Sequence, residues 1–314
     1  PYKEGVGGSS PSAPTRNVKK PGHLVGVVKT STSVLAIGTA ILIGVLVALA
    51  GSSGGLRWGG FPIFAWGALL VFLVQWVVFV PSWFAHTEHF FDLTGSLTYL
   101  AVVALTLLSR GSVTPYSLLV AAMVTAWALR LGAFLAARVR AAGSDSRFDA
   151  MKYRFAWFLM TWTLQGLWVL LTAGAALAAI TSPEDRQIEA FALLGVALWA
   201  FGFGIEVAAD EQKRRFRARP ENLDRFITTG VWARSRHPNY FGEILLWFGV
   251  AVAAFPSLSG WSMVTLVSPL FVWLLLTRVS GVPLLEAAAD RRWADNPEYE
   301  TYKAATPVLL FKMR

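Results

Sequence analysis

Apolar residues occur along this chain in long blocks, and short polar stretches separate the blocks. Each block is long enough to cross ~30 Å of hydrocarbon at ~1.5 Å per residue, and none has the polar face of a soluble amphipathic helix. The pattern predicts an all-α polytopic membrane protein with seven or eight transmembrane helices, over residues 34–50, 60–83, 93–108, 116–137, 155–180, 188–208, 240–255 and 261–279.

The first block decides between seven and eight spans. It could be mistaken for a signal peptide, but no small-residue cleavage pattern fits before the next block, so residues 34–50 are taken as a span. Residues 1–30 are rich in Gly, Ser, Pro and Lys and have no apolar periodicity, which predicts a disordered tail. We therefore expect a single transmembrane domain over residues 31–314.

Composition favours a bilayer as the solvent of this domain. Of the 314 residues 55% are hydrophobic, and the mean hydropathy of +0.51 is more than a soluble core of this size needs. The absence of cysteine excludes disulfides and thiol nucleophiles, and the four histidines form no HExxH pair. We expect no metal site.

The net charge of +9 is distributed unevenly over the connections. Two loops and the C-terminal tail hold most of the Lys and Arg, and only Arg57, Arg110 and Arg186 lie on the other side of the predicted spans. The positive-inside rule therefore places both termini and the two basic loops in the cytosol. Aromatic residues sit inside the spans and not among the basic ones, so no nucleic-acid partner is expected. The basic positions are Arg138, Arg140, Arg147, Lys152, Arg154, Lys213, Arg214, Arg215, Arg217, Arg219, Arg225, Arg234, Arg236, Arg291, Arg292, Lys303, Lys312 and Arg314.

Charged residues near the end of the sixth block invite a functional interpretation, because a charge within a membrane costs ~2.5–3.5 kcal/mol. Their spacing of i, i+4, i+8 and i+11 stacks them on one stripe of a helix that leads into the cytosol. A structural alternative is a chain of i,i+4 salt bridges at a helix end. The four residues are Glu206, Asp210, Arg214 and Arg217.

The segment before the seventh block also combines features of a binding site. Pro238 suits the first turn of a helix, whose free N–H groups beside Arg234 and Arg236 could bind an anion. Asn239 and Glu243 are spaced to point the same way, and Gly242 would let a ligand approach the backbone. Capping and topology would explain the proline and the arginines, but not a buried Glu243.

Together these residues resemble the bacterial branch of the steroid 5-alpha-reductase-like family. The specific part of the resemblance is Glu206-x-x-x-Asp210-x-Gln212-x-x-x-Phe216, then Pro220, Asn222, Gly230, Trp232 and the run Arg236-His237-Pro238-Asn239-Tyr240-Phe241-Gly242-Glu243. Weaker matches are Asp92–Thr98, Trp127–Gly132, Leu164–Gly166 and the closing Arg292-Trp293, Pro297-Glu298-Tyr299, Tyr302 and Thr306. The resemblance covers roughly residues 85–312.

The resemblance implies an NADPH-dependent reductase of a carbon–carbon double bond conjugated to a ketone, in a lipid such as a 3-oxo-4-ene steroid. Gly202-Phe203-Gly204 lies inside a span without a preceding strand or third glycine, so it is rejected as a dinucleotide fingerprint. The cofactor half is expected over about residues 200–314. Phosphate and ribose contacts are implied for Arg130, Asp210, Arg214, Arg217, Arg225, Asn239, Arg291 and Tyr299, with Glu206, His237, Tyr240 and Glu243 near the cofactor.

Three residues are implied on the substrate side. Asp92 opens the third span, where a carboxylic acid kept neutral by an apolar pocket could donate a hydrogen bond to the ketone; its alternative role is a helix N-cap. Trp127 stands where eukaryotic members have a tyrosine, and an indole N–H can donate a hydrogen bond but cannot act as a general acid. Gln165 could contact the substrate or make an interhelical hydrogen bond.

Two other functions remain open. Isoprenylcysteine carboxyl methyltransferases have a similar Arg-His-Pro-x-Tyr segment but use S-adenosylmethionine, and the chain could also be a non-enzymatic membrane protein or transporter whose charged stripe is structural. For the reductase we expect a monomer in a bacterial inner membrane, with membrane lipids around it, a lipid or steroid substrate from the bilayer and a cofactor site that faces the cytosol.

Overall fold

The computed structural model describes residues 28–142, 145, 148–222 and 224–312. The expected disordered tail lies outside the described residues up to position 27. Helices dominate the described chain, and eight of its helical segments are long and apolar enough to cross a membrane. The prediction of an all-α, multi-pass membrane protein is therefore confirmed, including the first block, which forms a helix like the others.

The helices follow the apolar blocks closely. In chain order the elements are α1 Thr30–Gly51, β1 Arg57–Trp58, β2 Phe61–Pro62, α2 Ile63–Phe84, α3 Phe91–Ser109, α4 Pro115–Ala142, α5 Phe155–Ile180, α6 Ala190–Arg217, α7 Pro238–Ala254, α8 Ser268–Leu274, α9 Val282–Trp293 and α10 Pro297–Ala305. The eighth span is composite and longer than expected, because a 3-10 turn over Gly260–Val267 precedes α8 and a π turn over Leu275–Val279 joins α8 to α9.

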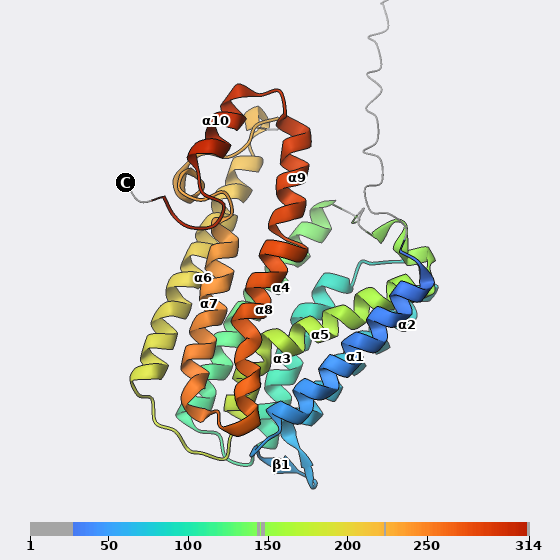
Figure 1. Ribbon diagram of the computed structural model, residues 1–314, viewed down its shortest axis with the longest axis vertical. Coiled ribbons are helices and arrows are strands. Elements are labelled where there is room, and N and C mark those ends of the chain that lie inside the picture. Colours follow the sequence, from blue (N-terminus) through green and yellow to red (C-terminus); the bar gives the residue numbers. More distant parts are fainter. Residues whose placement is uncertain (1–27, 143–144, 146–147, 223, 313–314) are drawn as a thin grey trace, which may run out of the picture.

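Two short antiparallel strands, which the hydropathy pattern did not predict, form a hairpin between α1 and α2. Gly59 and Gly60 connect the strands with φ values of +59° and +80°. Two successive residues with positive φ are typical of a tight hairpin turn, and glycine adopts this backbone conformation without strain. The hairpin lies at the lower end of the helices in Figure 1, with the connections that follow α3 and α5.

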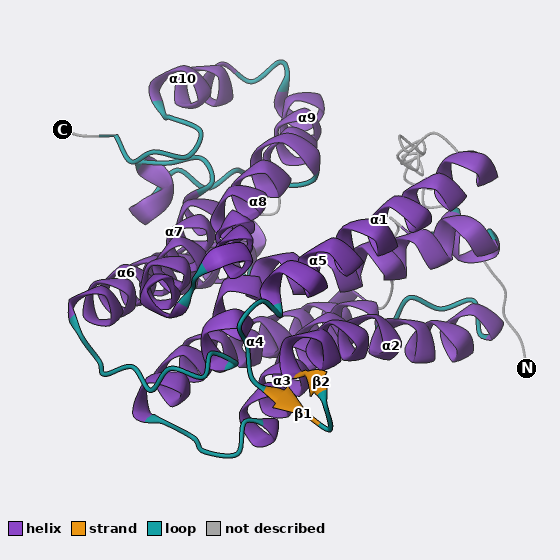
Figure 2. Ribbon diagram, turned by 60° about the horizontal axis from the view of Figure 1, so that its bottom comes forward, coloured by secondary structure: helices purple, strands orange, loops and turns teal. Residues whose placement is uncertain are grey.

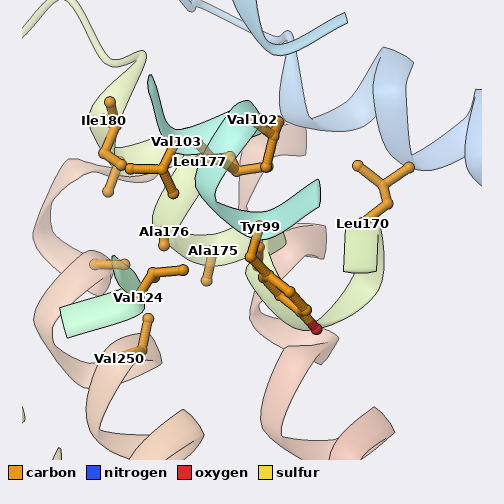
Figure 3. Close-up of a cluster of buried hydrophobic side chains, with 14 of the residues drawn as sticks. Tyr99, Val102, Val103, Val124, Leu170, Ala175, Ala176, Leu177, Ile180 and Val250 are labelled. Carbon is orange, nitrogen blue, oxygen red and sulfur yellow. The ribbon is translucent and has the colours of Figure 1, made fainter. Parts of the chain in front are cut away.

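The helix α5 occupies the centre of the fold. Its apolar window is 89% buried, against 22% for α1 and α6, whose apolar side chains face outward. Side chains from α3, α4, α5 and α7 meet in the core around α5 (Figure 3). There Tyr99 enters among aliphatic residues, with its hydroxyl oxygen directed away from Val102 and Val103. Small residues such as Ala175 and Ala176 allow the neighbouring helices to approach α5 closely.

The helices α6 to α10 lie together on one side of the molecule, and α1 and α2 lie on the other (Figures 1 and 2). α6 and α7 form the most extensive helix pair, and glycines line their contact. A Cβ atom on Gly242 would lie 2.7 Å from the backbone nitrogen of Glu206. The expected space for a ligand at Gly242 is therefore absent, because the backbone of α6 fills it.

Candidate functional site

A cleft lies at the upper end of α6 in Figure 1, between the α6–α7 connection and the helices α9 and α10. Its volume is about 240 Å³. The lining combines several cations with a wall of aromatic rings. The cationic residues are Lys213, Arg217, Arg225, Arg236 and Arg292, the aromatic ones are Phe216, Phe226, Trp232, Trp293, Tyr299 and Tyr302, and His237 and Glu286 complete the polar lining.

The floor of the cleft depends on a glycine turn after α6. Gly230 has a φ of +64°, and a Cβ atom there would lie 2.2 Å from Oε1 of Gln212. The same oxygen accepts a hydrogen bond of 3.0 Å from the backbone N–H of Val231. The next residue, Trp232, donates its indole N–H to the carbonyl of Ala209 at 3.0 Å. Only glycine fits between Gln212 and this turn, so the turn holds the Trp232 ring against α6.

The C-terminal segment holds the other side of the cleft in place. The backbone N–H groups of Arg236 and His237 donate to the carbonyls of Pro307 and Val308, at 2.9 and 3.0 Å. In addition, the Tyr302 hydroxyl donates to the carbonyl of Trp232 at 2.7 Å. These bonds satisfy backbone groups just before α7 and fix the arginine and histidine side chains at the cleft.

Glu286 on α9 connects this segment to the far wall. Its carboxylate lies 2.7 Å from Nε2 of His237 and 3.2 Å from Nη2 of Arg236. The His237 ring in turn stacks on Tyr240 of α7, with ring centroids 5.7 Å apart. Sequence reasoning missed Glu286 because it lies in no recognisable motif. The only available signal was its place on the face of α9 that carries Leu285, Ala289 and Arg292.

The aromatic wall consists of closely spaced rings. The Phe226 ring lies 5.3 Å from Tyr299, 5.5 Å from Trp293 and 5.7 Å from Tyr302, measured between centroids. Burial raises the pKa of Tyr302 to about 12. Burial and a 2.9 Å hydrogen bond to Asp290 also raise the pKa of Tyr299. Both phenols therefore keep their protons at neutral pH, and the wall carries no negative charge of its own.

The cations of the cleft are only partly neutralised. Arg236 pairs with Glu286, and Arg292 pairs with the exposed Asp224 at 3.1 Å. Within the part of the chain that the structure describes, neither Arg217 nor Arg225 forms an ion pair. Uncompensated guanidinium groups beside a cleft with aromatic walls make a binding site for an anion that also carries a ring.

A second polar cluster lies deeper, inside the membrane-spanning helices. Arg130 of α4 donates one terminal nitrogen to Glu206 and the other to Asp210, both on α6. Glu243 of α7 also interacts electrostatically with Arg130 and Asp210. The indole of Trp127 lies beside the Glu206 carboxylate, yet among the described residues its N–H has no hydrogen-bond partner of normal geometry. We call these five residues the buried acid cluster.

The residues expected on the substrate side fall into two places. Gln165 donates a 3.1 Å hydrogen bond to the carbonyl of Phe91 at the start of α3, which is the interhelical alternative considered for it. Gly95 makes this approach possible, because a Cβ atom there would lie 2.5 Å from Nε2 of Gln165. Asp92 lies in the first turn of the same helix, half-buried; Phe90, and not Asp92, is the N-cap. Trp127 lies instead in the buried acid cluster.

The expected cofactor residues are likewise divided. Arg217, Arg225, His237 and Tyr299 line the cleft, and Arg130, Glu206, Asp210 and Glu243 form the buried acid cluster. Arg214 pairs with Glu211 on the surface of α6 and not with Asp210, so the alternative of a chain of i,i+4 salt bridges is wrong. The exposed Arg291 does not line the cleft, and Asn239 and Tyr240 lie in the first turn of α7 between the two sites.

Comparison with known proteins gives one match. No curated protein and no solved structure matches the chain significantly. One protein family, described as "Protein of unknown function (DUF1295)", matches residues 76–306. The match begins within α2 and ends after α10, so it includes the cleft and the buried acid cluster and leaves out α1. The chain therefore belongs to the DUF1295 family.

Proposed function

We propose that the protein is an NADPH-dependent membrane reductase of a carbon–carbon double bond conjugated to a ketone, acting on a lipid or steroid from the bilayer. One observation carries the proposal: Arg217 and Arg225 have no ion-pair partner in the described chain and lie beside a wall of aromatic rings. Membership of DUF1295, a family related to steroid 5-alpha-reductase-like proteins, is in keeping with the resemblance of the sequence motifs.

The residues of the cleft fit the chemistry of a dinucleotide phosphate. NADPH carries about four negative charges, which suit several guanidinium groups that can each bind a phosphate in bidentate fashion. The aromatic wall around Phe226 offers surfaces on which an adenine ring could stack. Tyr299 and Tyr302 keep their hydroxyl protons at neutral pH, so they do not repel phosphates.

When bound, NADPH would supply a hydride to the β-carbon of the conjugated ketone. The protein must then stabilise negative charge on the ketone oxygen and deliver a proton to the α-carbon. Asp92 lies in the first turn of α3 and Gln165 donates to the carbonyl of the preceding Phe91, among membrane-spanning helices, and these two residues are the proposed contacts of the ketone. The Asp92 carboxyl group or the Gln165 amide would hold the ketone oxygen there by a hydrogen bond.

The charge of the cleft favours this function over that of a methyltransferase. S-adenosylmethionine carries a positive sulfonium group and a positive amino group against a single carboxylate, so it would be repelled by Arg217 and Arg225. A dinucleotide with several phosphates gains from the same cations. We further propose that the protein acts as a monomer in a bacterial inner membrane, with the cleft open to the cytosol, because the basic connections lie on that side.

Ligand protection from thermal unfolding tests the proposal on the purified protein in lipid nanodiscs. A ligand that binds only the folded state raises the melting temperature, and the rise grows with the logarithm of its concentration relative to Kd. We expect NADPH to raise it and S-adenosylmethionine to leave it unchanged. A set of conjugated-ketone lipids, followed by loss of NADPH absorbance, then tests the reaction. Protection by S-adenosylmethionine alone, or by neither ligand, would contradict the reductase assignment.

A further inference from the structure

The buried acid cluster contains more acid than base. Three carboxyl groups, those of Glu206, Asp210 and Glu243, share the single guanidinium of Arg130. Both terminal nitrogens of Arg130 are engaged by the two α6 carboxylates. Glu206 is 3% exposed, and all four residues lie within membrane-spanning helices. If every carboxyl were ionised, the cluster would hold two uncompensated negative charges.

Such a charge is costly in this position. An unpaired ion removed from water costs several kcal/mol even after relaxation, and a buried carboxylate avoids this cost by taking up a proton. From α3 the cluster meets the neutral phenol of Tyr99, which interacts electrostatically with Glu243 and supplies no positive charge. In the described chain, Arg130 is the one cation that forms an ion pair with these acids, and Lys213 adds only a longer-range electrostatic interaction with Asp210. At least one carboxyl in the cluster must therefore hold a proton at neutral pH.

The contacts indicate which acids hold it. Asp210 is 13% exposed at its side chain and is paired with Arg130, so its charge is well compensated. Glu243 forms no ion pair among the described residues and interacts electrostatically with Glu206 across the glycine contact between α6 and α7. One oxygen of Glu206, Oε2, is buried without a hydrogen-bond partner, and so is the indole nitrogen of Trp127 beside it. A proton on Oε2 or on Glu243 removes one of the two excess charges and the repulsion between the two glutamates.

We infer that Glu206 and Glu243 hold one proton between them, and that Glu206 is the proton source for the reduction. The second half of this inference rests on the proposed function. Trp127 lies beside Glu206, but its indole N–H is not acidic enough to protonate a carbon atom. A neutral carboxyl group is acidic enough to protonate the carbon of an enolate. Glu206 is therefore the acid available beside Trp127, a residue implied on the substrate side.

The step balances as follows. When bound, NADPH would supply the hydride for the new C–H bond at the β-carbon, and the double-bond electrons would then lie on the α-carbon and ketone oxygen as an enolate. The O–H bond of Glu206 breaks, and the enolate electron pair forms the C–H bond at the α-carbon with that proton. Glu206 is left as a carboxylate. Glu243 is then a carboxylate as well, and one proton taken up from solvent restores the shared proton of the pair.

Infrared difference spectroscopy tests whether Glu206 and Glu243 share a proton, and it needs no substrate or cofactor. In the parent protein at neutral pH we expect a carbonyl stretching band of a protonated carboxylic acid. Replacing either glutamate by glutamine, Glu206→Gln or Glu243→Gln, should remove the band. The matched control is Glu88→Gln, because Glu88 pairs with Lys152 at 3.2 Å and should contribute no such band. A band unchanged in both cluster variants, or no band in the parent, would overturn the shared proton.

Turnover with saturating NADPH and a conjugated-ketone lipid tests whether Glu206 is the proton source. Loss of a general acid lowers rates by ~10²–10⁴-fold, so Glu206→Gln should lose at least ~100-fold in turnover while its NADPH affinity changes less than ~2-fold. Unchanged turnover, or a loss confined to NADPH affinity, would overturn Glu206 as proton source. If the parent reduces no conjugated ketone, the proposed function fails, and the infrared result still decides whether the proton is shared.

Discussion

Gly202 of α6 and Gly242 of α7 face each other across a close helix contact, where a Cβ atom on Gly242 would lie 2.6 Å from the Gly202 carbonyl oxygen. The reverse distance, from a Cβ on Gly202 to the Gly242 oxygen, is 2.7 Å. One heptad further along, Gly195 and Gly249 repeat the contact. The two backbones touch directly, and this contact places Glu206 against α7.

The first prediction follows from this contact. Gly242→Ala should destabilise the protein by about 1–3 kcal/mol, because the added methyl group must push α6 and α7 apart. Gly204→Ala is the matched control: Gly204 lies on the same helix pair, but a Cβ atom there would meet nothing within 4 Å. Thermal unfolding in nanodiscs compares the two. Equal stability of both variants would show that the glycine contact is looser than the structure describes.

Hydropathy was sufficient to predict the spans, because the length and apolarity of a membrane helix are properties of a local stretch of sequence. It could not predict which helices pair. Gly195 and Gly202 repeat at a spacing of seven on α6, as Gly242 and Gly249 do on α7, but nothing local connects the two repeats. For the same reason Gly242 was interpreted as space for a ligand, when the backbone of another helix occupies that space.

The site was predictable to a similar extent. The family resemblance grouped Arg217, Arg225 and His237, which do line one cleft. Helical spacing placed Asp210 and Arg214 on one stripe, but the partner of Asp210 is Arg130, 80 residues earlier in the chain. Periodicity identifies neighbours on a single helix and contains no information on contacts between helices. Glu286 was missed because α9 joins the cleft only through the tertiary fold.

The second prediction concerns the unpaired cations. Arg217→Ala should weaken NADPH binding by about 1–3 kcal/mol, or roughly 5- to 150-fold in Kd, because a charge-assisted contact to phosphate is lost. The fold should be unaffected, since this side chain has no ion-pair partner in the described chain. Arg215→Ala is the control, because Arg215 is exposed and pairs with Glu211 at 2.5 Å outside the cleft. Equal affinity of both variants would place the cofactor elsewhere.

The third prediction concerns orientation. The natively cysteine-free chain allows single cysteines to be labelled with an impermeant maleimide in intact cells. A substitution at Arg147 would test the first basic loop, but Arg147 lies outside the described residues, so two exposed positions within them are preferable. Arg186→Cys should be labelled from outside, and Glu221→Cys only after lysis. The opposite pattern would reverse the assignment of the cleft to the cytosol.

The last prediction separates the ketone contact from the proton source. Asp92 lies in the first turn of α3, one residue after the carbonyl that Gln165 binds, so a substrate ketone at this position would meet both side chains. Asp92→Asn retains a hydrogen-bond donor and loses the acid, and Asp92→Leu loses both.

Because the contact strengthens as negative charge develops on the oxygen, the effect should appear in turnover and barely in NADPH affinity. The leucine variant should lose roughly 10²–10³-fold, as expected for one lost oxyanion donor, and the asparagine variant should be intermediate. The infrared band of the Glu206–Glu243 pair should persist in both variants, since Asp92 is not part of that cluster. Turnover of Asp92→Leu near the parental value would leave Asp92 with a structural role at the start of α3 and Gln165 as the candidate ketone contact.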